Sequence, residues 1–72
     1  MISVASALNQ EDIKELLDNY NGDNFSYKFI KKEGIKLFFE SSGNADEAAR
    51  NAREIIKNTV WGKILYFKSQ AE

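Results

Sequence analysis

Apolar residues recur along this chain with two different periods, and the order of these periods limits the fold more than any other feature. Some segments repeat at i, i+3 and i+4, the spacing of an amphipathic helix, and others alternate as in a half-buried strand. Helical spacing covers residues 9–20 and 45–58, and alternation or a dense apolar run covers residues 2–8, 25–29, 35–39 and 60–68. The sequence therefore predicts strand, helix, strand, strand, helix, strand.

Polar residues mark the ends of these segments. Asn9 and Asn44 stand where helix N-caps belong, and Glu47, three residues after Asn44, resembles half of a capping box. Gly22 is expected to end the first helix. Gly34 lies in a polar break between two alternating segments, so a β-hairpin is predicted there.

This order of elements in 72 residues resembles the ferredoxin-like fold, and the resemblance covers the whole chain. We expect one domain, residues 1–72, of the α+β class with βαββαβ order. Its four-stranded antiparallel sheet should carry both helices on one face and have the first and third strands in the centre. Many unrelated functions share this fold, so the resemblance assigns none of them.

Two families with a similar layout have motifs from which this sequence departs. Gly34 matches the glycine of the RNP1 motif of RNA-recognition domains, but Glu33 replaces a basic residue, and Ile35 and Leu37 replace stacking aromatics. ACT domains typically have a glycine after the first strand, and residues 7–9 contain none.

Composition excludes several kinds of chemistry. The chain has no His and no Cys, which rules out Ser-His and Cys-His nucleophile pairs, imidazole or thiolate metal sites and thiol redox. Its paired carboxylates fit solvent-facing helical turns better than acid/base work. We therefore expect a non-enzymatic protein with no metal and no cofactor. The apolar segment 2–8 is too short to span a membrane, so we also expect a cytoplasmic protein without a membrane partner.

The sheet face turned away from the helices is the predicted binding surface. If Ile2, Val4 and Leu8 point toward the helices, the first strand presents only small residues outward. A strand over 60–68 would carry an apolar set on each face, so one set must lie outside. The predicted surface comprises Ala5, Lys28, Ile30, Lys36, Phe38, Lys63, Leu65 and Phe67.

Two functions fit such a surface. The first is self-association, as a homodimer, or binding of another protein, which would also support a domain whose core is small. The alternative is binding of an anion or of single-stranded nucleic acid, because most of the basic residues fall in or beside predicted strands. These residues are Lys28, Lys31, Lys32, Lys36, Lys63 and Lys68.

Overall fold

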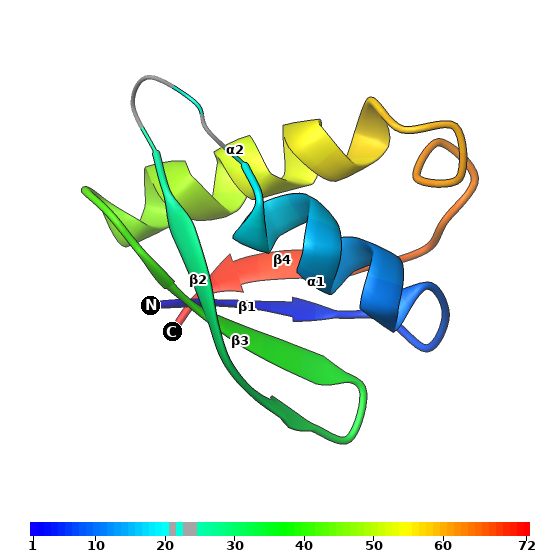
Figure 1. The fold of residues 1–72 in the computed structure, drawn as a ribbon, viewed down its shortest axis with the longest axis horizontal. Coiled ribbons are helices and arrows are strands. Elements are labelled where there is room, and N and C mark those ends of the chain that lie inside the picture. The colour runs from blue at the N-terminus through cyan, green and yellow to red at the C-terminus, as the bar shows by residue number, and fades with distance from the viewer. Residues whose placement is uncertain (21, 23–24) are drawn as a thin grey trace.

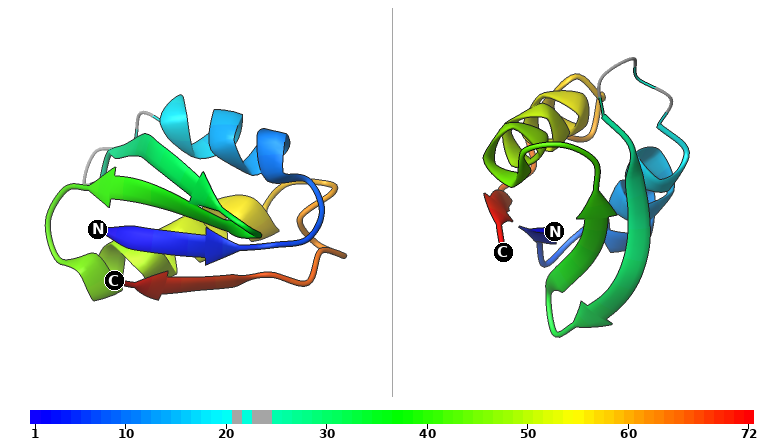
Figure 2. Two further views of the ribbon diagram at one scale, coloured as in Figure 1. Left: turned by 90° about the horizontal axis from the view of Figure 1, so that it is seen from below. Right: turned by 90° about the vertical axis from the view of Figure 1, so that its left-hand side faces the viewer.

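The computed structural model describes residues 1–20, 22 and 25–72, and these form a small α+β domain with two helices and a four-stranded antiparallel sheet. The elements are β1 (Ile2–Ala5), α1 (Gln10–Asp18), β2 (Tyr27–Glu33), β3 (Lys36–Ser41), α2 (Ala45–Lys57) and β4 (Lys68–Ala71). The strands lie in the order β2-β3-β1-β4. Both helices cover the same face of the sheet (Figures 1 and 2). The α+β class and the order of elements are confirmed.

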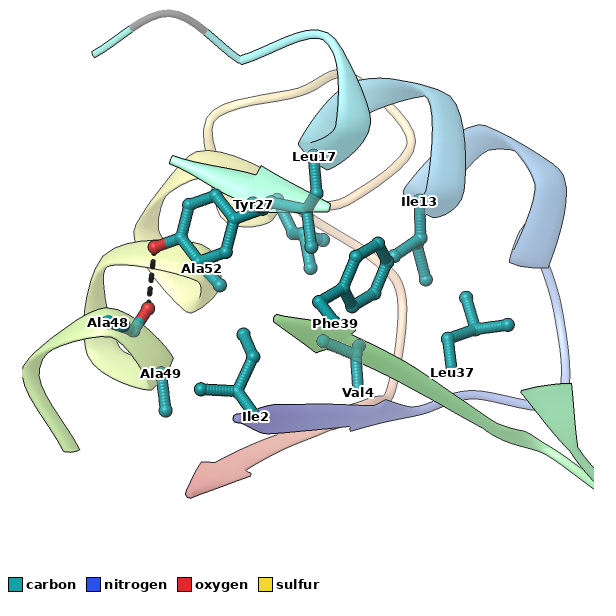
Figure 3. Close-up of a cluster of buried hydrophobic side chains, with 11 residues drawn as sticks. Ile2, Val4, Ile13, Leu17, Tyr27, Leu37, Phe39, Ala48, Ala49 and Ala52 are labelled. Atoms are coloured by element: carbon teal, nitrogen blue, oxygen red, sulfur yellow. Dashed lines mark hydrogen bonds between the residues drawn. The ribbon is translucent and has the colours of Figure 1, made fainter. Parts of the chain in front are cut away.

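Alternate residues of the central strands form the floor of the core. Ile2 and Val4 of β1 and Leu37 and Phe39 of β3 point toward the helices (Figure 3). The helices contribute Ile13, Leu17, Ala48, Ala49, Ala52 and Ile56. Three of these helical residues are alanines of α2, and such small side chains let that helix lie close to the sheet.

A buried tyrosine links β2 to α2. The Tyr27 hydroxyl donates to the Ala48 carbonyl oxygen at 2.6 Å (Figure 3). It also accepts from the Asn51 side-chain amide at 3.0 Å. Burial raises the pKa of Tyr27 above its ordinary value, and the Asn51 hydrogen bond opposes that rise. The phenol is therefore held in its neutral form.

The two helices begin differently. The Asn44 side chain accepts from the Glu47 backbone N–H at 3.1 Å, so the predicted cap of α2 is confirmed. Asn9 stands at the N-cap of α1 but has φ 57° and makes no side-chain cap; its amide donates to Asp12 at 2.8 Å instead. The predicted end of α1 at Gly22 is wrong, because Asn19 already forms the C-cap.

The predicted hairpin is present, and its strands are longer than the sequence suggested. A two-residue turn, Gly34 and Ile35, joins β2 to β3, and Gly34 has φ +60°. The register shifts between Phe29 and Lys31, which is a β-bulge. The bulge places Lys31 opposite Phe38 on the sheet face turned away from the helices, called here the outer face.

The predicted strand over residues 60–68 is wrong, because β4 includes only Lys68 of that segment. The chain instead turns back onto the end of α2. The Thr59 hydroxyl donates to the Ile56 carbonyl at 2.7 Å and accepts from the Gly62 N–H at 2.8 Å. Gly62 lies so close to Ile56 that a Cβ there would collide with its carbonyl oxygen. In addition, Lys68 pairs with Ala5, the last residue of β1, so earlier residues have no partner in that strand.

Neither helix of the described residues is long and apolar enough to cross a bilayer.

Candidate functional site

A groove of about 520 Å³ lies at one end of the sheet, where β1 ends and β4 begins. Three segments meet there: the loop after β1, the β2–β3 turn and the residues before β4 (right-hand side of Figure 1). We call it the end groove, and it is lined by Ala5, Ser6, Ala7, Leu8, Ile35, Ile64, Leu65, Tyr66 and Lys68.

The end groove is surrounded by large apolar side chains that are open to solvent. The exposed fraction is 67% for Leu8, 52% for Ile35, 90% for Ile64 and 94% for Tyr66. One exposed apolar residue is ordinary on a protein surface, whereas four around one hollow form a patch of the kind that contacts other molecules.

Backbone bonds of Ser6 hold one wall of the end groove in place. The Ser6 N–H donates to the Ile35 carbonyl at 3.0 Å, which ties the loop to the β2–β3 turn. The Ser6 hydroxyl donates to the Leu8 carbonyl at 2.6 Å, closing a tight local turn. This turn directs the chain away from the sheet after Ala5, so Leu8 lies at the surface and not in the core as predicted.

The chemistry of the end groove is that of a binding surface. Its titratable lining groups are Tyr66 and Lys68. Within the described part of the chain, no cluster of three or more His, Cys, Asp or Glu side chains could hold a metal ion. The arrangement suits contact with an apolar surface.

The outer face, which the sequence predicted as the site, is mostly polar. Lys28 lies opposite Glu40, and Lys36 lies opposite both Ala5 and Glu33. Lys36 Nζ is also 3.7 Å from the Glu72 carboxylate, and Lys31 Nζ is 3.0 Å from that of Glu33. Lys31 and Lys36 of this face are therefore each close to an anion.

Phe38 is on the outer face but is not available to a ligand. Its exposed fraction is 9%. The Lys31 and Lys36 ammonium groups lie 5.2 and 5.9 Å from the centre of its ring. Ile30, at the bulge of β2, is apolar and 47% exposed. The covered ring of Phe38 offers no open aromatic face for base stacking. Among the predicted basic residues, Lys31 and Lys36 form ion pairs within the protein.

The predicted site residues Lys63, Leu65 and Phe67 do not lie on a strand. Leu65 and Phe67 are half-buried and pack against the core, and Leu65 also lines the end groove. Lys63 is exposed in the turn after α2. Ala5 and Leu65 are thus the predicted residues that the structure brings to the end groove.

The Glu72 carboxylate lies on the outer face, between Ser3 of β1 and Lys36 of β3. Glu72 accepts from the Ser3 hydroxyl at 2.5 Å and from the Gln70 side-chain amide at 3.0 Å. The Ser3 hydrogen bond, followed by that from Gln70, lowers the pKa of Glu72. The Ser3 contact links β1 to the residue that follows β4.

Sequence reasoning did not name Leu8, Ile35, Ile64 or Tyr66 as site residues. It had Leu8 pointing toward the helices and the other three on strands, and it left open which face of the last strand carries Ile64 and Tyr66. The signal that could have placed these last two in a loop was the pair Thr59 and Gly62 directly after a helix, a combination that favours a turn over a strand.

Comparison of the chain with protein-family models, curated proteins and solved structures finds no match.

Proposed function

We propose that this protein is a non-catalytic domain of ferredoxin-like topology that functions by self-association, with two copies meeting through their end grooves. The strand order β2-β3-β1-β4 supports the topology, since β1 and β3 are central and both helices share one face. Its lack of Cys suits the reducing cytoplasm, which we propose as its compartment.

The observation that carries the proposal is that a hollow and two projecting side chains occur on the same surface. Ile64 and Tyr66 line the end groove and are almost fully exposed. A two-fold interface brings the same patch of both subunits together, so each copy must supply both the projection and the hollow. Inserting Tyr66 of one copy into the groove of the other would meet that requirement.

Burial of the exposed apolar side chains around the end groove can supply the free energy of a weak dimer. Burying one large apolar side chain contributes about 1.5–3 kcal/mol, which is roughly one to two factors of ten in the dissociation constant. Four such side chains surround the groove, and part of their contribution offsets the entropy lost on association.

The proposal is tested by measuring solution mass by sedimentation from about 10 µM to about 1 mM, a range that brackets weak dimers. We expect the mass to rise toward that of a dimer. Tyr66→Lys should weaken association at least about tenfold, through lost burial and a charge placed beside Lys68. The fold should survive, because the Tyr66 side chain is exposed.

Ile30→Lys is the matched control. It introduces the same charge at an exposed apolar residue of β2, away from the end groove. Association of this variant should equal that of the parent. A monomer at every concentration would refute the proposal, and so would an Ile30→Lys effect as large as that of Tyr66→Lys.

A further inference from the structure

The two edges of the sheet differ in how their backbone groups are used. On the β2 edge, the Phe29 N–H donates to the Asp18 carboxylate at 3.2 Å, and the bulge at Ile30 disturbs the strand. Bulges and bonded edge groups discourage another strand from pairing. The β4 edge pairs with β1 in a regular register from Lys68 to Ala71.

Ser69 and Ala71 carry the unused backbone groups of β4. The Glu72 N–H donates to the Met1 carbonyl at 2.9 Å, and hydrogen-bonded positions alternate along an antiparallel pair. The peptide groups of Lys68 and Gln70 therefore point toward β1, and those of Ser69 and Ala71 point away from it. Among the described residues, no group outside the ladder bonds to the Ser69 or Ala71 backbone.

A positively charged flank of α2 runs beside this free edge. A groove of about 250 Å³ separates them, lined by Asp46, Ala49, Arg50, Arg53, Ser69, Gln70 and Ala71. Arg50 and Arg53 are exposed. Across the described ranges, the ion pairs within 4.0 Å are Lys31–Glu33 and Lys36–Glu72, so neither arginine is paired there. With one aspartate against two arginines, the groove is cationic.

We infer that the β4 edge binds an extended segment of another protein, which adds to the sheet as a fifth strand and directs acidic side chains toward Arg50 and Arg53. The free groups of Ser69 and Ala71 supply the main-chain hydrogen bonds of strand addition. The guanidinium groups supply the preference for carboxylates. A second copy is disfavoured at this edge, because pairing β4 with β4 brings the arginines of both copies together. This surface is separate from the end groove, so the inference does not depend on the proposed function.

The test uses the full chain, labelled with ¹⁵N, and a capped peptide of about eight residues, a common strand length, that alternates Glu and Thr. We expect saturable shifts of the Ser69 and Ala71 amides. Their hydrogen exchange should slow at least about tenfold at saturation, because pairing protects them. A peptide with Lys in place of Glu should bind at least about tenfold more weakly.

Reversing the charge of the two arginines tests whether they, and not the overall charge of the protein, set the preference for acidic peptides. The double substitution Arg50→Glu and Arg53→Glu should weaken binding of the Glu peptide at least about tenfold. The Lys peptide should then bind more tightly than the Glu peptide. Lys57→Glu reverses one charge in the last turn of α2, outside the groove, and should leave both affinities unchanged within about twofold.

Three results would overturn the inference: no binding at millimolar Glu peptide, equal binding of the two peptides, or amide shifts that avoid β4. The inference would also be overturned if the chain with both Arg50→Glu and Arg53→Glu still bound the Glu peptide as the parent does, while its amide spectrum remained that of the folded protein.

Discussion

Phe38 and Tyr27 show that the neighbours of an aromatic residue decide its role. Phe38 belongs to the face without helices, yet two lysine side chains shield its ring. Tyr27 belongs to the helix-covered face, and its hydroxyl is kept there by two hydrogen bonds. Neither side chain is free to bind a ligand, and both serve the stability of the domain.

Tyr27→Phe is expected to lower the free energy of unfolding by about 1–3 kcal/mol, because the Asn51 amide and the Ala48 carbonyl each lose a partner inside the protein. Urea unfolding at neutral pH measures the loss. Tyr66→Phe removes a hydroxyl from an exposed ring and should have no effect on the monomer. Equal effects of the two substitutions would show that the buried hydroxyl is not stabilising.

The same hydroxyl predicts how stability depends on alkaline pH. The pKa of Tyr27 is raised in the native state above its ordinary value of 10.0, so the native state holds this proton more tightly than the unfolded chain. Its contribution is fully present below pH 10.0 and falls as pH rises through the native pKa. The stability difference between the parent and Tyr27→Phe should therefore be constant up to about pH 10 and shrink above it, as measured by urea unfolding.

At the scale of elements, the two helix starts perform different tasks. Asn44 satisfies a backbone N–H of α2 with its side chain. Asn9 contributes its backbone conformation, since φ 57° allows the turn from β1 into α1. The same residue type therefore acts as a cap in one place and as a turn residue in the other.

Asn44→Ala should lower stability by about 1 kcal/mol and the melting temperature by about 4–8 °C, because the cap is lost. Asn9→Gly should cost nothing or stabilise slightly, since glycine adopts positive φ without strain. Thermal unfolding followed by circular dichroism measures both. If Asn9→Gly destabilises as much as Asn44→Ala, the side chain of Asn9 has a role beyond the turn.

At the scale of the whole molecule, the small size of the chain limits how much surface it buries on its own. The folded chain exposes 4630 Å², close to the roughly 4,500 Å² expected for 8.2 kDa. A chain of this size hides only about 60% of its unfolded surface. The area buried between two copies in the proposed dimer would therefore be a substantial addition to the area that one chain buries on folding.

Self-association therefore predicts a melting temperature that depends on protein concentration. Raising the concentration about a hundredfold should raise the melting temperature by several degrees, because only the folded state dimerises. Tyr66→Lys should show a flat dependence, and Ile30→Lys should behave as the parent does. Calorimetry across the concentration series provides the measurement. A melting temperature of the parent that does not change with concentration would contradict the proposed dimer.

Local patterns determined the elements that have one buried face. The apolar stripe in α2, the alternation in β3 and the Asn44 cap each depend on residues close together in the chain. Their spacing in the sequence was therefore sufficient to predict them. The α+β class followed from their order. Because the sequence contains no His and no Cys, composition alone also excluded whole classes of catalysis.

Tertiary structure decided which residues of the apolar run 60–68 joined the sheet and where the site lies. That apolar run had the composition of a strand, but a strand needs a partner, and β1 ends at Ala5. The contact of Gly62 with the end of α2 turned the run into a loop instead. Leu8, Ile35, Ile64 and Tyr66 come from segments far apart in sequence and meet only when the sheet is complete. Spacing along a chain records which face of one element is buried, whereas a groove between elements depends on where each partner ends.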